Sequence, residues 1–344
     1  MTEEKINVEQ TTHEKSVAES ADLMTPMSLR VAATLRLADL VPEEGATVAE
    51  IAALVDVEAT SLGRLLDHLV TVGAFEHEEE FGRYTVTAWG RQLRSDDPHP
   101  LRPGLDLHGA LGRAQLAAVE LLHTVTTNGD AYSRRYGRDF WTDLAATPAL
   151  RASFDATMQH RIHGDATTLL NAFDWSRFTH LVDVGGGDGL ILASVLEAHP
   201  QMRGHVVERA ETIAQASARL TRAVLARRAV ALEGNFLDSL PEGADLYLLS
   251  DIVHNWADEE AISILSNCAN AMAPHGAVVV VETMLDGEPD QPRNTGMDLN
   301  MWTFLGGRER TQHQIVDLAA HCGLHLAGQK HIGPWRNLLE FRLG

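Results

Sequence analysis

Five short apolar runs between residues 181 and 283 constrain the fold more than any other feature of this sequence. They read LVDV, HVVE, AVALE, ADLYLLS and AVVVVET, and they alternate with stretches that have helical spacing. Continuous apolar runs of this length are typical of strands that are buried on both faces of a parallel sheet. Strands that alternate with helices predict a doubly wound α/β sheet, which we place in a domain over residues 176–344.

The first hundred residues have a different pattern. Apolar residues recur at helical spacing from Leu23 to Leu40, and the segment Thr47–Glu50 has the spacing of a capping box that opens a short helix. A second helix is predicted over 59–72, and alternating residues between 73 and 90 predict a two-stranded hairpin. Two helices followed by a hairpin indicate a winged-helix domain over residues 19–100.

The charge of this domain argues against DNA as its partner. Residues 1–100 hold 8 Lys and Arg against 19 Asp and Glu, and the whole chain has a formal net charge of −20. Binding to nucleic acid or to an anionic membrane requires cations that neutralise phosphates. We therefore interpret the domain as a packing or dimerisation domain, with a DNA-binding regulator as the less favoured alternative, and predict neither nucleic acid nor membrane as a partner.

The remaining segments complete the expected organisation. Residues 1–18 are polar and are predicted to form a disordered tail, and residues 101–175 are predicted to be a helical region that links the domains and covers the substrate. The start of the chain lacks the apolar stretch of a signal peptide, and no apolar run is long enough to span a bilayer. Cys268 and Cys322 are far apart in the sequence and suit a reducing compartment, so we expect a cytoplasmic protein.

A glycine-rich segment directly follows the first predicted strand. Residues Asp183–Gly189 read DVGGGDG, and glycines between a strand and a helix let a ligand approach the bare backbone. Leu190 stands where the dinucleotide-binding pattern needs glycine or alanine. The spacing D-x-G-x-G-x-G instead favours the methionine end of S-adenosylmethionine, with Asp183, Gly185 and Gly187 as cofactor-binding residues.

Two further strand ends carry candidate cofactor contacts. Glu208 ends the second predicted strand, where an acidic side chain can accept hydrogen bonds from ribose hydroxyls. Asn235 and Phe236 follow the third strand, where an amide and an aromatic ring could hold the adenine. Each of these residues could equally be an ordinary surface residue at a strand end, and their combination with the glycine-rich segment strengthens the functional interpretation.

Several motifs together resemble the small-molecule O-methyltransferases that have a winged-helix N-terminal domain. The segments Asp183–Gly189, Gly234–Phe236, Ser250–Glu259 and Gly306–Thr311 carry the resemblance. The family includes plant caffeate and flavonoid methyltransferases and bacterial polyketide-tailoring enzymes, and the segment DLNMWTFLGG is most similar to the anthracycline-tailoring branch. The resemblance implies a class I methyltransferase fold with a Rossmann-like sheet, an S-adenosylmethionine cofactor, an aromatic substrate and a homodimer formed through the winged helix and its leading helix 27–40.

The resemblance also assigns residues to the site. His254 matches the catalytic base of the family, and Glu282 and Glu309 match the two acids that orient it. Ser250 matches a cofactor contact, together with the residues named above. The resemblance further implies a set of substrate-contacting residues, which are Met158, Asn255, Asp298, Met301 and Trp302.

The predicted reaction follows from the chemistry of these groups. A phenol with a pKa of ~10 is a poor nucleophile until it loses its proton, and a histidine with a pKa of ~6.5 can accept that proton. Members of the anthracycline branch have Leu-Asn-Trp in this segment, and some of them hydroxylate rather than methylate. The present chain has His254 before Asn255, which favours methyl transfer to a polyketide-like phenol and leaves hydroxylation or a pericyclic step as the alternative.

Seventeen histidines also raise the question of a metal. His160 and His163 have the i, i+3 spacing of one helical face, and His77 lies within the acidic run Glu76–Glu80. Neither has a neighbouring third ligand in the sequence, and the histidine-base methyltransferases work without a metal. We therefore predict no metal site.

Overall fold

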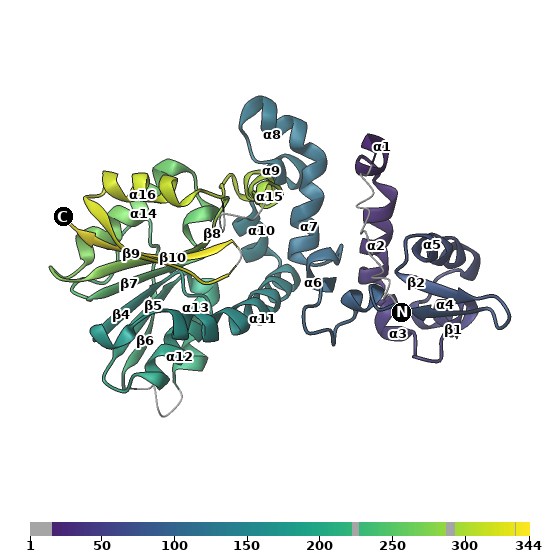
Figure 1. The fold of residues 1–344 in the computed structure, drawn as a ribbon, viewed down its shortest axis with the longest axis horizontal. Helices are drawn as coiled ribbons and strands as arrows, with labels where there is room; N and C mark the ends of the chain where they lie inside the picture. Colours follow the sequence, from purple (N-terminus) through teal and green to yellow (C-terminus); the bar gives the residue numbers. More distant parts are fainter. Residues whose placement is uncertain (1–15, 222–226, 287–292, 334) are drawn as a thin grey trace, which may run out of the picture. The chain divides into compact units, whose positions relative to one another are not determined.

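The computed structural model describes residues 16–221, 227–286, 293–333 and 335–344, without the side chains of residues 160–165, 211 and 215. The predicted tail over residues 1–18 lies almost entirely outside the described residues, and so do the side chains of His160 and His163. The chain forms two compact units, residues 1–108 and 109–344, which Figure 1 draws as ribbons. No helix among the described residues is long and apolar enough to cross a membrane.

The N-terminal unit has the winged-helix arrangement that the sequence predicts. Its elements are α1 (Val17–Ser20), α2 (Met24–Thr34), α3 (Leu37–Leu40), β1 (Ala46–Thr47), α4 (Val48–Val55), α5 (Ala59–Thr71), β2 (Phe75–Glu78), β3 (Arg83–Val86) and α6 (Arg102–Leu105). The capping box is present, because the Thr47 side chain accepts a hydrogen bond from the Glu50 amide while the Glu50 carboxylate accepts one from the Thr47 amide. Strands β2 and β3 form the predicted hairpin, and β1 adds a third strand to it.

One expectation for this unit was wrong. The segment from Leu23 to Leu40 forms two helices rather than one, because Arg36 adopts a left-handed conformation with φ of 58°. The Arg36 guanidinium donates to Asp39 on the next turn. Apolar periodicity continues across the break because both helices bury residues in the same core, which includes Ala33 and Leu37.

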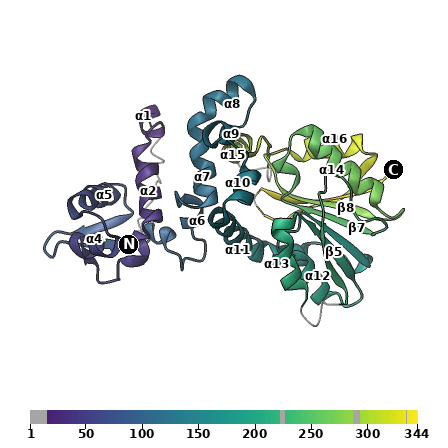
Figure 2. The same ribbon diagram turned by 180° about the vertical axis from the view of Figure 1, so that it is seen from behind.

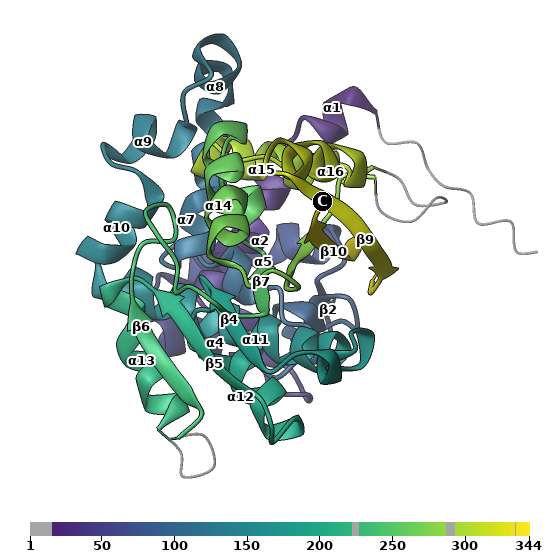
Figure 3. The same ribbon diagram turned by 90° about the vertical axis from the view of Figure 1, so that its left-hand side faces the viewer.

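The C-terminal unit is built on a seven-stranded sheet with the order β6-β5-β4-β7-β8-β10-β9. The strands are β4 (His180–Val184), β5 (Arg203–Glu208), β6 (Ala229–Glu233), β7 (Leu246–Ser250), β8 (Ala277–Thr283), β9 (Leu324–His331) and β10 (Arg336–Leu343). The five predicted strands, β4 to β8, are present and pair in parallel. The sequence did not predict β9 and β10, which pair antiparallel at one edge of the sheet (Figure 3).

Helices cover both faces of this sheet (Figures 1 and 2). On one face, α14 (Asp258–Ala271) and α16 (Gln312–His321) pack on side chains such as Val182 and Val280. On the other face, α12 (Leu190–Ala198) and α13 (Ala210–Leu220) pack on alternate side chains such as Leu181 and Val279. The core therefore lies in two layers, as expected for a doubly wound sheet.

A helical region follows residue 108, and one helix that comes after β8 in the sequence joins it. It consists of α7 (Ala110–Leu116), α8 (Leu121–Thr127), α9 (Ala131–Tyr136), α10 (Phe140–Ala146), α11 (Pro148–Ala172) and α15 (Thr295–Leu305). All of these helices except α8 contribute to one apolar core, which includes Tyr132, Phe140 and Phe304. The helical character predicted for residues 101–175 is confirmed, and α15 joins the same layer from a distant part of the sequence.

The connectivity of the sheet fixes the place of the functional site. The chain runs from β4 outward through β5 to β6, and then returns to form β7 on the other side of β4. In open α/β sheets, ligands bind outside the carboxyl ends of the strands at such a reversal. The glycine-rich segment after β4 and Ser250 at the end of β7 both lie at this point.

Candidate active site

A cavity of about 550 Å³ lies at the carboxyl ends of the strands. Every residue that the sequence assigned to the cofactor lines this cavity, namely Asp183, Gly185, Gly187, Glu208, Asn235, Phe236 and Ser250. The cavity wall also includes His254 and three of the predicted substrate residues, Met158, Asn255 and Met301. A single cavity thus brings the glycine-rich segment, the histidine and an apolar wall together.

The backbone of the glycine-rich segment requires glycine at two positions on the cavity wall. Gly185 and Gly187 have φ values of 68° and 58°, which L side chains rarely adopt. A Cβ on Gly185 would lie 2.6 Å from the Ile252 Cδ1 atom, whereas no atom lies within 4 Å of the Cβ position of Gly187. The segment is therefore closely packed at its start and open at Gly187, where a ligand can approach the main chain.

Glu208 lies against this open part of the segment. One carboxylate oxygen accepts a hydrogen bond from the Gly187 amide at 3.2 Å, and the other accepts one from the Arg209 amide at 2.9 Å. Burial raises the pKa of Glu208, and the two amide hydrogen bonds oppose that rise. The carboxylate is thus held in place beside the glycine-rich segment with lone pairs that remain for ribose hydroxyls.

Local contacts fix the other strand-end residues. Asn235 Oδ1 accepts the Leu237 amide, and the ring of Phe236 meets the Trp256 ring edge-to-face at 5.9 Å. Ser250 Oγ accepts a hydrogen bond from Arg336 at 3.2 Å. Contacts within the protein therefore orient Asn235, Phe236 and Ser250, which are predicted to contact the cofactor.

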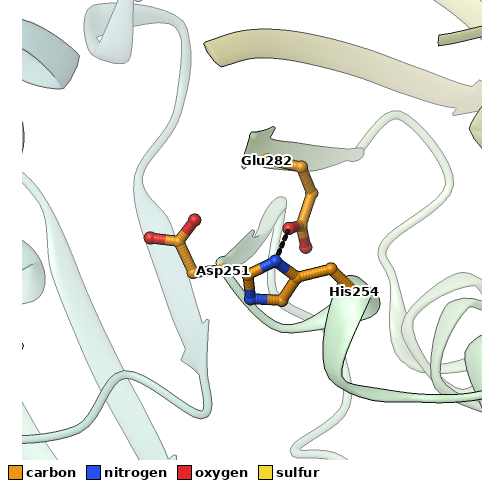
Figure 4. A group of neighbouring side chains, drawn as sticks. All are labelled: Asp251, His254 and Glu282. Carbon is orange, nitrogen blue, oxygen red and sulfur yellow. Dashed lines mark ion pairs between the residues drawn. The ribbon is translucent and has the colours of Figure 1, made fainter. Parts of the chain in front are cut away.

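His254 lies on a short 3-10 turn, Val253–Asn255, and its Nδ1 atom faces two carboxylates. Nδ1 is 3.1 Å from Glu309 Oε1 and 3.5 Å from Glu282 Oε2, and both glutamates are about 1% exposed. Since an ionised carboxylate can only accept, Nδ1 carries a hydrogen and its N–H group donates a hydrogen bond to Glu309. The second ring nitrogen, Nε2, lies on the side away from Glu282 (Figure 4) and is left free of this pairing.

Glu282 connects the histidine to the sheet. It lies in β8, and its Oε1 atom accepts the amides of Ile252 and Val253 at 3.0 and 2.6 Å. The same carboxylate thus holds the backbone before His254 and faces the imidazole.

The charges around His254 favour its protonated form in the absence of a bound cation. Burial alone lowers the pKa of His254, but the nearby carboxylates of Glu282 and Glu309 outweigh this effect and raise the pKa to about 9. Burial also raises the pKa of Glu282, while the imidazolium opposes that rise. Histidines perturbed this strongly inside a cavity are typical of functional sites.

One group among the described residues has the geometry of a possible metal site. Asp251, His254 and Glu282 each place a ligand atom within 4.8 Å of the others (Figure 4). Asp251, however, pairs with the Arg336 guanidinium at 3.0 and 2.9 Å, and Glu282 is bonded to backbone amides as described above. Arg336 competes with a metal for both Asp251 oxygens, and the absence of a metal stays our prediction.

Four predicted site residues do not line the cavity. Glu282 and Glu309 lie behind His254 rather than beside the cavity, and Asp298 accepts the Glu309 amide at 3.0 Å. Trp302 donates its indole N–H to Asn128 at 3.0 Å. Asp298 therefore supports the position of an acid that faces His254, and Trp302 contacts the residue that caps the C-terminal end of α8.

Most of the apolar wall of the cavity was not predicted from the sequence. Phe140, Trp141, Phe154 and Phe304 line the cavity and pack edge-to-face on one another at centroid distances of 5.2 to 5.8 Å. Three of them lie in α10 and α11 and the fourth in α15. The cluster of aromatic residues within the predicted helical region was a usable signal, whereas the contribution of α15 depends on the tertiary fold.

Comparison with known proteins identifies the family. Residues 119–325 match the model of the O-methyltransferase domain, and residues 19–96 match that of the O-methyltransferase dimerisation domain. The chain is 43% identical to a 2,7-dihydroxy-5-methyl-1-naphthoate 7-O-methyltransferase of Streptomyces carzinostaticus, over 88% of this chain and 90% of the relative. It is also 42% identical to an aclacinomycin 10-hydroxylase of Streptomyces purpurascens, over 94% of this chain and 87% of that protein.

Solved structures agree with this result. The crystal structure of an O-methyltransferase from neocarzinostatin biosynthesis, bound to S-adenosylmethionine and 2-hydroxy-5-methyl naphthoic acid, superposes with a TM-score of 0.90 at 40% identity. The match covers 96% of this chain and all of that structure. The chain therefore belongs to the S-adenosylmethionine-dependent O-methyltransferases and carries both the dimerisation domain and the catalytic domain of the family.

Proposed function

We propose that this enzyme methylates a phenolic hydroxyl of a fused-ring, polyketide-like natural product, with His254 as the general base. The observation that carries the proposal is the position of His254. It lies on the wall of a cavity that also contains the glycine-rich segment and the aromatic side chains, and its Nδ1 atom is held by Glu309. In the neutral imidazole, Nε2 is thus available to accept a proton from a hydroxyl in the cavity.

The residues at the carboxyl ends of β4, β5 and β6 fit the cofactor. Gly187 offers open backbone, Glu208 has a fixed carboxylate beside it, and Asn235 and Phe236 lie on the next strand end. When bound, S-adenosylmethionine supplies an activated methyl group for an in-line displacement. The contribution of the chain is to hold the acceptor oxygen in position and to remove its proton.

The wall of the cavity supports a flat aromatic acceptor. Phe140, Trp141, Phe154 and Phe304 form one continuous aromatic surface, and Met158 and Met301 add flexible apolar side chains. Asn255 is the polar residue beside the base, and its side chain donates to the Asp251 carbonyl at 3.0 Å. The relatives named above act on a naphthoate and on aclacinomycin, which are both fused-ring compounds of this shape.

Assay of the reaction products tests the proposal. Incubation with S-adenosylmethionine and a panel of hydroxylated naphthoates and anthracyclinones is expected to add one methyl group to a phenol. One equivalent of S-adenosylhomocysteine should form for each product molecule, as measured by mass spectrometry. A phenol-blocked analogue of the accepted substrate serves as the control and should remain unchanged.

The 42% identical hydroxylase supports a second candidate, in which the same fold and cofactor serve a reaction other than methyl transfer. The same assay separates the two functions. Substrate conversion without release of S-adenosylhomocysteine would exclude methyl transfer and establish the second candidate.

We also infer that the enzyme works as a homodimer in the cytoplasm. The dimerisation-domain match supports the dimer, and Leu23 and Met24 at the start of α2 are each 65% exposed in the single chain. Light scattering at micromolar concentration is expected to show a dimer, and replacing both residues by glutamate should shift it toward a monomer. Leu54→Glu, at a 62% exposed position on α4, is the matched control. A wild-type monomer would contradict the inference.

A further inference from the structure

Arg310 is a buried cation next to the site that does not line the cavity. Arg310 is 2% exposed. Its guanidinium contacts three groups of the segment 253–258. Nη1 donates to the Val253 carbonyl at 3.0 Å, and Nη2 donates to the Trp256 carbonyl at 2.9 Å. Nε and Nη2 both donate to Asp258 Oδ1, at 3.0 and 2.7 Å.

These acceptors lie on both sides of His254. Val253 precedes the histidine and Trp256 follows it by two residues, so one rigid guanidinium spans the whole 3-10 turn. The Val253 carbonyl also accepts the Trp256 amide at 3.3 Å, so the guanidinium adds a second hydrogen bond to it. The planar fork of arginine can bond several oxygens at once, which the point charge of lysine cannot do in the same geometry.

The segment that carries Arg310 is itself fixed at both of its ends. A Cβ on Gly307 would lie 2.2 Å from the His254 carbonyl oxygen, so only glycine allows this close approach. The Arg310 carbonyl accepts the Leu285 amide at 2.9 Å, two residues beyond the end of β8. Arg310 thus connects the His254 turn to the strand that carries Glu282.

We propose that Arg310 is a positioning residue that fixes the His254 turn, so that Nδ1 meets Glu309 and Nε2 faces the cavity. The proposal rests on the proposed role of His254 as general base. A buried guanidinium contributes little to stability compared with a packed apolar side chain, because its desolvation offsets the attraction of its partners. Its hydrogen bonds to both sides of one catalytic turn therefore indicate a role in geometry.

Arg310→Lys tests the proposal by keeping the charge and removing the fork. We expect kcat to fall by about 10- to 100-fold, because a displacement of the base by about 1 Å costs that much. The Kd for S-adenosylmethionine, measured by calorimetry, should stay within about twofold. The proposed cofactor residues, apart from Ser250, lie at the ends of β4, β5 and β6, away from the His254 turn. Arg308→Lys is the matched control, since the Arg308 side chain contacts the same Asp258 carboxylate at 3.4 Å but is 45% exposed. It should retain the wild-type kcat.

Combining the change with His254→Ala separates positioning from a general structural role. If Arg310 acts through His254, Arg310→Lys should have no further effect on kcat once the imidazole is absent. An equal loss of kcat in both backgrounds would overturn the proposal and leave the role of His254 intact. A wild-type rate in His254→Ala alone would instead refute the base, which is the failure of the proposed function.

A second variant decides the question if Arg310→Lys does not bind cofactor with full stoichiometry. Asp258→Asn keeps the hydrogen bonds from Arg310 to both carbonyls and weakens its interaction with residue 258. The Asp258 side chain is 49% exposed, so this change disturbs the buried core little. We expect a smaller fall in kcat that also disappears in the His254→Ala background. A fall of the same size in the His254→Ala background would overturn the positioning role.

Discussion

Replacing His254 by alanine is expected to lower the methyl-transfer rate by about 10²–10⁴-fold at neutral pH, the usual contribution of a positioned general base. The affinity for S-adenosylmethionine should stay close to that of the wild type, because the residues proposed to hold it, apart from Ser250, lie at the ends of β4, β5 and β6. Single-turnover rates and calorimetry measure the two quantities separately. His205→Ala is the control, since this half-buried histidine of β5 does not line the cavity.

The rate of the wild-type enzyme is expected to increase with pH. The pKa of about 9 means that His254 in the free enzyme is mostly protonated at neutral pH and becomes a base as the pH rises. The value of kcat/KM for the cofactor reports the free enzyme and should therefore increase up to about pH 9. A sulfonium in the same cavity disfavours the imidazolium, so kcat should level off at a lower pH.

The alanine variant should lose this titration. Its rate should instead increase toward the pKa of the acceptor phenol, ~10, where the hydroxyl ionises without help. Glu282→Gln should give a smaller defect than His254→Ala, because it disturbs the orientation of the imidazole without removing it. A wild-type rate and an unchanged pH profile in His254→Ala would show that proximity alone drives the reaction.

Replacing Glu208 by alanine is expected to weaken the binding of S-adenosylmethionine by about 10- to 100-fold for each ribose hydrogen bond that is lost. Hydrogen bonds to a charged group contribute ~1.5–3 kcal/mol each, and ~1.4 kcal/mol corresponds to a factor of ten. The loss should exceed that of an exposed contact, because Glu208 also fixes the Gly187 amide at 3.2 Å. Calorimetric titration with the cofactor measures the change.

The neighbouring strand provides a matched control for Glu208. Glu233 ends β6 directly opposite Glu208 in the parallel register, is exposed and does not line the cavity. Glu233→Ala should bind the cofactor like the wild type. Gly187→Val should abolish binding in a folded protein, because a β-branched side chain is strained at φ of 58° and would enter the open space beside Glu208. Unchanged affinity in Glu208→Ala would remove this residue from the site.

Parts of the fold could be predicted because their signals are local. The five apolar runs form β4 to β8, and the glycine-rich turn follows β4. Buried strands require runs of apolar residues, and positive φ values favour glycine, so both features can be recognised in the sequence. The Thr47 capping box formed for the same reason, because both of its partners lie within one helical turn. The sequence of β9 lacks a clear apolar pattern, because most of its side chains are exposed at the edge of the sheet.

The sequence by itself determined which residues are candidates for the chemistry, through local motifs and their resemblance to a family. Only the tertiary structure decided how they meet. His254 and Glu309 are 55 positions apart, and they come within 3.1 Å because α15 and the segment after it return to the carboxyl ends of the strands. The aromatic wall and the Arg310 contacts likewise join elements that are distant in the chain. Periodicity records which face of an element is buried, but not which distant side chain it will contact, because that choice depends on the packing of the whole unit.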